Sequence, residues 1–315
     1  MTRATITGLG TAIPDARLTN GELEQRLDTS DEWIVARTGI RERRVAAPSE
    51  TSSTLAVEAA GGAIKDAGLV PDDVDLLIVA TTTPDQALPE TSALVHEGLG
   101  LRGGAFDVGA ACAGFVHALV VGATLLDAGH LDAVVVVGSE TLTRIVDPTD
   151  RGTVPLFGDG AAAALLQPSV RNDRGLLAWD LGCDGSASGI LQVPPGERYI
   201  RMEGQEVFRR AVRAVLASAD VALRGAGYTA ADVDLFVPHQ ANARIIAMAA
   251  ERLGISPERT MVNVDRYGNT SAASVPLALA EAAESGRVHD GDLVLLSGFG
   301  AGMTWASAVL RWGGV

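Results

Sequence analysis

Short apolar runs alternate with longer, helix-like stretches along most of the chain. The apolar runs are bounded by turn residues, which is typical of buried strands. They span residues 74–80, 105–108, 132–138, 233–238 and 290–298. The longest helix-like stretches span residues 55–67, 114–128 and 207–224. Since apolar strands that alternate with helices usually form parallel sheets covered on both faces, the pattern predicts an α/β fold.

Two segments of this pattern repeat each other. Residues 66–79 read DAGLVPDDVDLLIV and residues 225–238 read GAGYTAADVDLFVP, so the AG and DVDL letters align at a constant offset of 159 positions. Each copy follows a helical stretch and enters an apolar strand, which favours duplication over a chance similarity between two ordinary strand–helix units. We therefore predict an N-terminal half at 1–168 and a C-terminal half at 169–315.

The duplication also predicts where a site between the halves would lie. At an offset of 157 positions, Cys112 falls opposite Asn269, and both residues precede Ala-rich helices. A two-fold arrangement would bring the two helix N-termini to one central cleft. A cleft between two halves of a chain is a common place for an active site.

Composition narrows the class of protein. The chain has 315 residues, 47% of them hydrophobic, and a formal net charge of −14, which disfavours a nucleic-acid-binding protein. No apolar run approaches 18 residues, and the first residues, MTRATITG, lack an apolar signal core. We therefore expect neither a membrane span nor a signal peptide. The two cysteines form no CxxC motif or metal-like cluster, so we expect no metal site and a cytoplasmic location.

Three polar residues follow predicted strands or turns and are candidates for catalysis. Cys112, in GAACAGF, lies at a strand–turn–helix junction where the helix dipole would favour its thiolate, although a lone cysteine is often an inert core residue. His239, in PHQAN, directly follows a strand, and Asn269, in YGNTSAAS, precedes a helix; either could instead cap a helix. The GFGAG segment at 298–302 could form a simple turn or present backbone N–H groups to an oxyanion.

In their order and spacing, these motifs resemble the ketoacyl-ACP synthase III family, where ACP is acyl carrier protein. Residues 28–43 (DTSDEWIVARTGIRER) and 150–160 (DRGTVPLFGDG) are also similar to it, and the resemblance covers essentially the whole chain. It implies the thiolase-like fold, with five αβαβα layers built from two similar halves, in a homodimer. It also implies a condensing enzyme that takes an acyl group from acyl-CoA and joins it to malonyl-ACP, giving a 3-ketoacyl-ACP.

The resemblance assigns roles to individual residues. Cys112 would be the nucleophile that carries the acyl group, while His239 and Asn269 would bind the thioester oxygen of the malonyl unit. The backbone N–H groups of Cys112 and Ala301 would form the oxyanion hole. Acyl-CoA would be a substrate rather than a cofactor, and its expected contacts are Thr29, Trp33, Arg37, Arg151, Gly204 and Asn242.

Docking of an acidic carrier protein on this acidic chain requires a local basic patch. The resemblance implies that Arg209 and Arg244 lie at the mouth of the site and dock the carrier. Further positive charge would come from Arg41, Arg43, Arg44, Arg210 and Arg213.

The starter acyl group depends on the loop at 81–90 (TTTPDQALPE), which in the family reaches across the dimer into the partner's acyl site. Leu88 in this loop is smaller than the Phe of acetyl-preferring relatives, so we expect room for a branched or longer starter. A priming ketosynthase or acyltransferase of a polyketide pathway, with a non-acetyl starter, is the alternative function.

Two other functions are disfavoured. A degradative thiolase would need a second cysteine near 298–302, and that segment has none. A non-catalytic binding protein would not need the complete set of Cys112, His239 and Asn269.

Overall fold

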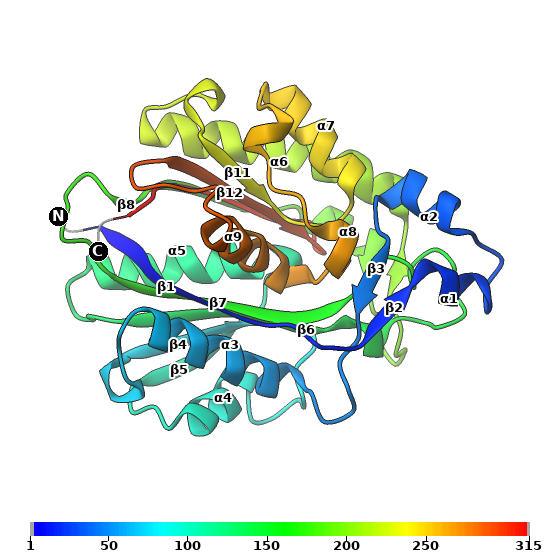
Figure 1. The fold of residues 1–315 in the computed structure, drawn as a ribbon, viewed down its shortest axis with the longest axis horizontal. Coiled ribbons are helices and arrows are strands. Elements are labelled where there is room, and N and C mark those ends of the chain that lie inside the picture. Colours follow the sequence, from blue (N-terminus) through cyan, green and yellow to red (C-terminus); the bar gives the residue numbers. More distant parts are fainter. Residues whose placement is uncertain (1–2, 314–315) are drawn as a thin grey trace.

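Two mixed β-sheets are stacked with helices between them and outside them (Figure 1). The computed structural model describes residues 3–313. The first sheet has the strand order β1 (Ala4–Ala12), β7 (Asp159–Pro168), β6 (Val134–Thr141), β4 (Leu76–Ala80) and β5 (Gly104–Val108). The second has the order β11 (Leu235–Pro238), β12 (Leu293–Gly300), β13 (Thr304–Arg311) and β8 (Gly175–Cys183). Polar residues are rare in the central strands because both faces of each sheet are covered.

The helices form three layers around the two sheets (Figure 1). The inner layer holds α5 (Gly114–Asp127) and α9 (Ser274–Glu284), which are apolar around most of their circumference because a sheet packs on either side. The outer helices have one apolar face and one polar face, as expected beside solvent. They are α3 (Ser52–Asp66) and α4 (Thr91–Leu99) on the first sheet, and α6 (Gly204–Ala226) and α7 (Ala243–Leu253) on the second.

Smaller elements surround one end of these layers. A hairpin of β2 (Arg17–Thr19) and β3 (Glu42–Arg44) encloses two short helices. The short elements are α1 (Asn20–Glu24), α2 (Asp31–Thr38), α8 (Val264–Tyr267), β9 (Leu191–Gln192) and β10 (Arg201–Met202). The 3₁₀ turns that bear on the site are η2 (Ala111–Ala113) and η7 (Ser271–Ala273).

The two sheets repeat one topology. The neighbours β1, β7, β6 and β4 have the same order and relative directions as β8, β13, β12 and β11. The fifth strand, β5, has only a parallel bridge between Phe236 and Thr260 as its counterpart. The predicted α/β fold of five αβαβα layers and two similar halves is therefore confirmed.

The predicted pairing of Cys112 with Asn269 is wrong. The 3₁₀ turns η2 and η7 are equivalent, since each begins with a residue of positive φ (47° at both Ala111 and Ser271) and runs into an inner helix. This equivalence has an offset of 160 positions, so Cys112 corresponds to Ala272. Asn269 lies in the segment before η7, and the 3₁₀ turns that separate strand from helix were not evident in the sequence pattern.

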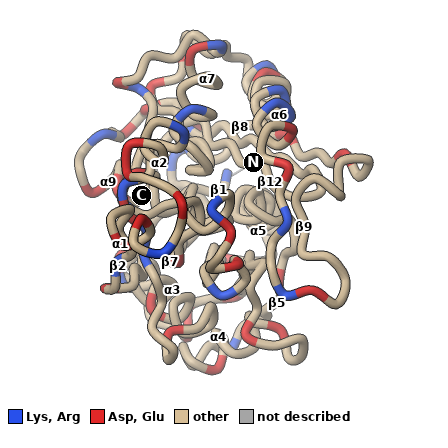
Figure 2. Tube along the Cα trace, turned by 90° about the vertical axis from the view of Figure 1, so that its right-hand side faces the viewer, with Lys and Arg blue, Asp and Glu red and all other residues tan. Residues whose placement is uncertain are grey.

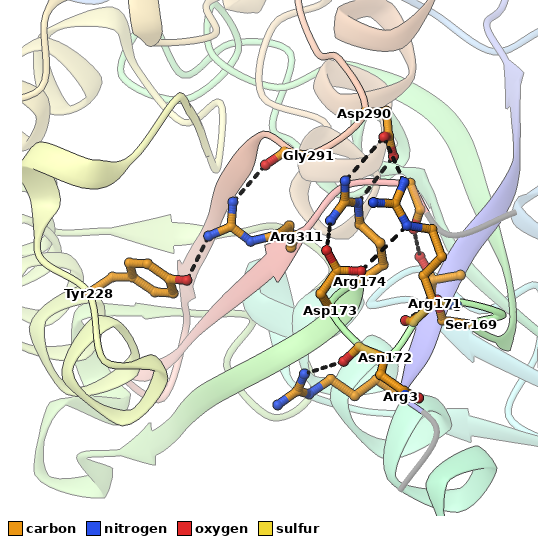
Figure 3. Close-up of polar contacts among 12 residues, drawn as sticks. Arg3, Ser169, Arg171, Asn172, Asp173, Arg174, Tyr228, Asp290, Gly291 and Arg311 are labelled. Atoms are coloured by element: carbon orange, nitrogen blue, oxygen red, sulfur yellow. Dashed lines mark hydrogen bonds and ion pairs between the residues drawn. The ribbon is translucent and has the colours of Figure 1, made fainter.

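A polar cluster joins the segment between the two sheets to the turn before β12 and to the start of β1 (Figure 3). The Arg174 side chain is only 8% exposed, and its guanidinium donates to both carboxylate oxygens of Asp290 at 3.1 Å. Asp290 also accepts from Arg171, and Arg3 donates to the carbonyl of Asn172. These bonds connect the linker between β7 and β8 to the turn before β12 and to the start of β1.

Candidate functional site

A cavity of about 730 Å³ opens between α2, α6, α7 and the loop at 150–157. Cys112, His239 and Asn269 all line it, although they come from three separate turns. Cys112 lies in η2 at the start of an inner helix, His239 follows β11, and Asn269 follows α8. The structure thus brings together the three residues that the sequence singled out for catalysis.

A second, smaller cavity of about 220 Å³ also reaches Cys112. Cys112, Phe157 and Leu191 line both cavities, and Ala301 lines the smaller one. Most of the remaining lining is apolar, contributed by Leu142, Ile145, Val193 and Ile200. The thiol therefore stands where a wide, partly polar entrance meets a narrow apolar chamber.

Burial controls the ionisation of Cys112. The pKa of the thiol is raised to about 12, mainly by loss of hydration; the Ser271 hydroxyl lowers it and the nearby Glu140 carboxylate contributes to the increase. Cys112 is only 9% exposed, so burial acts against the thiolate, in the opposite direction to the stabilisation expected from the helix N-terminus.

Two glycines let the end of β12 touch the turn that carries Cys112. A Cβ on Gly300 would lie 2.5 Å from the backbone nitrogen of Cys112, and one on Gly298 would lie 3.0 Å from the Cα of Ala113. Only a residue without a side chain fits this approach. Ala301 follows directly, which brings the two backbone groups predicted for the oxyanion hole into one region of the site.

His239 is buried and neutral. Burial lowers the pKa of its imidazole to about 3. Its Nδ1 lies 2.6 Å from the hydroxyl of Ser274, and its ring meets that of Phe299 edge-on with centroids 5.1 Å apart. Its backbone N–H donates to the carbonyl of Ser297 at 2.7 Å. The imidazole is therefore held by both β12 and α9.

Asn269 is held by the other half of the chain. Its N–H donates to the carbonyl of Leu156 at 2.8 Å, and its carbonyl accepts from Gly158 at 3.0 Å. Its Oδ1 accepts from the N–H of Ser271 at 2.9 Å, so it caps the 3₁₀ turn rather than α9, whose N-cap is Ala273. This bond uses the oxygen and orients the amide while leaving its nitrogen for other contacts.

Five of the six residues expected to bind CoA line the main cavity. Trp33 stacks directly against two guanidiniums, Arg37 at 4.4 Å and Arg151 at 4.8 Å from its ring centroid. Arg151 is also paired with Asp28 at 2.9 Å. An adenine could be flanked by Trp33 and Arg151 only after Arg151 has moved away from the indole.

The other three expected CoA contacts differ in their surroundings. Gly204 and Asn242 line the main cavity. The Asn242 side chain is also used structurally, since it caps α7 at Arg244 and donates to the carbonyl of Arg37. Thr29 is not part of the cavity lining, and its buried hydroxyl has no hydrogen-bond partner among the described residues.

The two expected docking residues also differ. Arg244 is exposed, lines the main cavity and lies 5.8 Å from the Phe208 ring. Arg209 lies outside this cavity, beside a shallow surface hollow, and is paired with Glu206. Figure 2 shows that basic residues recur along α6, which carries Arg209.

Of the further basic residues, Arg43 was wrongly expected to supply surface charge. It is fully buried, and its guanidinium donates to Asn20 and to the carbonyls of Leu18 and Pro155. Burial lowers its pKa to about 10. Arg210 is paired with Glu206 and Asp184, and Arg44 is half-buried and donates to the carbonyl of Pro14, which leaves Arg41 and Arg213 as exposed cations.

Leu88 lines neither cavity of its own chain and is 76% exposed. Its loop ends at α4, whose first N–H groups, from Thr91 and Ser92, donate to Asp107 on β5. Leu88 therefore lies on the same flank as the outer strand of the first sheet. A role for it in an acyl site requires a second copy of the chain.

Several residues of the site were missed from the sequence. Phe299 and Ser274 lie inside motifs that were recognised, but nothing local indicated that they contact His239. Glu140 could have been found as an acidic residue at the end of an apolar strand. It is fully buried, and its carboxylate accepts hydrogen bonds from Thr82 and Thr83. Burial raises its pKa.

Two kinds of feature are not found in the described part of the chain. Within residues 3–313, no group of three or more His, Cys, Asp or Glu side chains is arranged to hold a metal ion. Across the same residues, no helix combines the length and apolar character needed to cross a membrane.

Comparison with known proteins gives matches along the whole chain. A family model described as 3-Oxoacyl-[acyl-carrier-protein (ACP)] synthase III matches residues 106–185, and the model of its C terminal matches residues 223–312. The Beta-ketoacyl-[acyl-carrier-protein] synthase III of Symbiobacterium thermophilum is 49% identical over 323 aligned positions, covering 98% of either chain.

Solved structures of similar proteins also match essentially the whole chain. The beta-ketoacyl-[acyl carrier protein] synthase III of Thermus thermophilus has a TM-score of 0.94 and 47% identity, covering 99% of this chain and all of that one. The priming beta-ketosynthase from the R1128 polyketide biosynthetic pathway has a TM-score of 0.93 and 39% identity, covering 100% of this chain and 98% of that one.

Proposed function

The chain belongs to the beta-ketoacyl-[acyl-carrier-protein] synthase III family of condensing enzymes, and from this premise we propose how its own residues carry out the reaction. Cys112 takes an acyl group from acyl-CoA. The acyl-enzyme then condenses with malonyl-ACP, and the product is a 3-ketoacyl-ACP.

The position of Cys112 between the two cavities carries this proposal. The larger cavity, of about 730 Å³, has room for the pantetheine arm of CoA or of a carrier protein. The smaller, apolar cavity of about 220 Å³ accepts the acyl chain. A thioester that spans both cavities would have its carbonyl carbon beside the sulfur.

The first step replaces one thioester by another. The sulfur of Cys112 attacks the acyl carbonyl, the bond to the CoA sulfur breaks, and the thiol proton ends on the departing CoA. The backbone N–H groups of Cys112 and Ala301 stabilise the oxyanion between these states.

In the second step the malonyl carboxylate leaves as CO₂. The negative charge that develops on the thioester oxygen is stabilised by His239 and Asn269, which share the cavity with Cys112. The enolate carbon attacks the acyl-Cys112 carbonyl and the thiolate leaves, taking up a proton. A neutral imidazole suits this role, since it can donate a hydrogen bond from one nitrogen without gaining a charge.

The test is mass spectrometry of the intact protein after mixing with acetyl-, isobutyryl- and hexanoyl-CoA. Wild-type protein should gain one acyl mass, and the Cys112→Ala variant none. Asn269→Ala should still be acylated but should condense with malonyl-ACP about 10²–10³-fold more slowly, as when a single oxyanion donor is lost. Acylation of Cys112→Ala would contradict the proposal.

We extend the proposal to the starter group. The smaller cavity has the volume of roughly seven water molecules at ~30 Å³ each, which exceeds the need of an acetyl group. Leu88 of a second copy would enlarge the space further relative to Phe. Isobutyryl- or hexanoyl-CoA should therefore acylate Cys112 faster than acetyl-CoA, and strict preference for acetyl-CoA would overturn this part.

A preference for a starter larger than acetyl would also suit an enzyme that primes polyketide synthesis, which is the second candidate function. The priming beta-ketosynthase from the R1128 pathway shares 39% identity and the fold with this chain. Parallel condensation assays with malonyl units on fatty-acid and polyketide carrier proteins would separate the two pathways, because only the preferred carrier should give fast turnover.

A homodimer accompanies this function. The strand β5 lies at the edge of its sheet, residues 104–106 are exposed, and 37% of Phe106 is accessible. Such an edge pairs readily with a second copy. The same flank carries Leu88, so a dimer built here would bring this side chain towards the partner's acyl cavity. Both cysteines are free, which supports a cytoplasmic location.

A further inference from the structure

Ser274, the first residue of α9, contacts the imidazole of His239 at Nδ1. Its Oγ lies 2.6 Å from Nδ1, and both residues are 1% exposed. The same Oγ accepts a hydrogen bond from the backbone N–H of Gln240 at 3.3 Å. The imidazole of His239 and the backbone N–H of Gln240, which are neighbours in sequence, therefore both contact the hydroxyl of Ser274 at the start of α9.

The hydrogen bonds around this hydroxyl determine the direction of the short contact. A serine hydroxyl has one proton to donate, and the Gln240 N–H can only donate. If Nδ1–H also donated to Oγ, the serine proton would need a third group, and none of the described residues accepts it. Donation from Ser274 to Nδ1 satisfies all three groups.

The backbone at this point is rigid, so the hydroxyl meets a fixed ring. The side-chain amide of Gln240 donates from its nitrogen to the carbonyls of Pro238 and Met261, and its oxygen accepts from the backbone N–H of Asn263. The backbone N–H of His239 donates to the carbonyl of Ser297, and its ring packs against Phe299. Rotation of the imidazole to exchange its two nitrogens would break this arrangement.

We propose that Ser274 is a positioning residue that holds His239 in the tautomer with its proton on Nε2, and so assigns the imidazole to hydrogen-bond donation rather than proton abstraction. The inference rests on the proposed condensation. A neutral imidazole has one N–H, and burial keeps His239 neutral. With Nδ1 occupied as acceptor, Nε2–H is the group left to stabilise the enolate oxygen of the malonyl thioester.

This assignment separates the two steps of the reaction. An imidazole that has no free acceptor nitrogen cannot remove the Cys112 proton, so acylation should not depend on Ser274. Decarboxylation and condensation should depend on it, because they need the donor in place when charge develops.

The tautomer is read directly by ¹⁵N NMR of protein labelled at histidine. The His239 signals are identified by their loss in His239→Gln, since the chain has five histidines. The expected spectrum has a proton on Nε2 and an unprotonated, hydrogen-bonded Nδ1. A proton on Nδ1 in the wild-type protein would overturn the proposal, whatever the enzymatic activity.

Kinetics of three variants test the role. Ser274→Ala should lower the rate of malonyl decarboxylation and condensation by at least about 10-fold, and by less than the roughly 10²–10³-fold loss seen when a whole oxyanion donor is removed. Its rate of Cys112 acylation should stay within about twofold of wild type. Ser274→Thr keeps the hydroxyl and should restore most of the condensation rate.

Ser307→Ala is the matched control, because it removes a buried hydroxyl that bonds Ser297 and does not contact the imidazole. It should leave both rates unchanged. If Ser274→Ala slowed acylation as much as condensation, a general structural role would replace the proposed one. If wild-type Cys112 were not acylated at all, the proposed function would fail, while the NMR measurement would still decide the tautomer.

Discussion

Burial sets the acid–base state of the residues that line the site. It raises the pKa of the Cys112 thiol to about 12 and lowers that of the His239 imidazole to about 3. Both shifts favour the uncharged form, which is the general effect of moving an ionisable group out of water. At neutral pH the resting site therefore holds a thiol and a neutral imidazole, not an ion pair.

This state predicts the pH dependence of alkylation at Cys112. Only the thiolate reacts, so a raised pKa makes the rate low at pH 7 and increases it about tenfold per pH unit up to pH 9, with no plateau. The measurement is the rate of iodoacetamide labelling in a Cys183→Ser background, which leaves one thiol. An unstructured peptide with one cysteine, whose thiol pKa is about 8.5, should level off as the pH rises above 9. A plateau at pH 7–8 for the protein would contradict the prediction.

At the scale of elements, the site depends on how closely β12 approaches the turn η2. The close contacts come from glycines at the strand end, and the peptide that follows contributes the Ala301 N–H expected in the oxyanion hole. The turn itself has a residue of positive φ at Ala111, as its counterpart η7 has at Ser271. Two equivalent turns thus present Cys112 on one side and support Asn269 on the other.

Gly300→Ala should therefore impair the enzyme. The added methyl group would lie 2.5 Å from the Cys112 nitrogen and 2.9 Å from the Ala111 Cβ, so the turn or the strand must shift. We expect a loss of about 1–3 kcal/mol in the free energy of unfolding and a loss of about 10²-fold in the acylation rate. Thermal unfolding and the mass-spectrometric acylation assay measure the two effects.

Gly21→Ala is the control for this substitution. Gly21 lies in α1 with no atom within 4 Å of its would-be Cβ, so the variant should acylate normally and change stability by less than about 1 kcal/mol. Normal acylation by Gly300→Ala would show that the close approach is not needed.

At the scale of the whole molecule, the two halves are joined by more than their shared inner helices. The cluster around Arg174 and Asp290 ties the linker to the second sheet (Figure 3). The hydrogen bonds from Arg174, with a further contribution from Arg171, lower the pKa of the Asp290 carboxyl. This cluster should therefore stabilise the fold only while Asp290 is ionised.

The sign of this effect gives a stability prediction for Asp290→Asn. Because the pKa of Asp290 is lower in the folded state, its contribution to the free energy of unfolding is complete above the pKa of the unfolded chain, about 3.9. This contribution is lost as the pH falls through the pKa of the folded state. Wild type should be more stable than Asp290→Asn at pH 5–7, and the difference should shrink towards pH 3. Urea unfolding of both proteins across this range tests it, and a difference that grows on acidification would contradict it.

The exposed edge of β5 gives a prediction about assembly. Phe106→Arg places a charge where a second copy would pair, so it should shift the protein from a dimer towards a monomer of 32.5 kDa in sedimentation analysis. Val170→Arg, at a position that is 79% exposed in the linker, should leave the dimer intact. A wild-type protein that stays monomeric at high concentration would overturn the proposed assembly.

Local patterns in the sequence were sufficient for the α/β class, the repeat and the motifs around Cys112, His239 and Asn269. Apolar runs of strand length report burial directly, and turn residues mark where strands end. The repeat was visible because equivalent positions keep similar residues, as in the two DVDL segments. Each of these features depends on neighbours in the chain, which is why sequence alone determined it.

Contacts between distant segments, which only the tertiary structure reveals, decided the rest. Asn269 is held by residues 156–158 of the other half, and the Nδ1 of His239 meets a hydroxyl 35 positions away. Arg43 looks like a surface charge in its sequence but is enclosed by the fold. The protonation of Cys112 depends on how much water the surrounding atoms exclude. These atoms come from distant segments, so no local sequence pattern encodes this desolvation. The sequence therefore determined which residues could act, and packing decided their charge, orientation and neighbours.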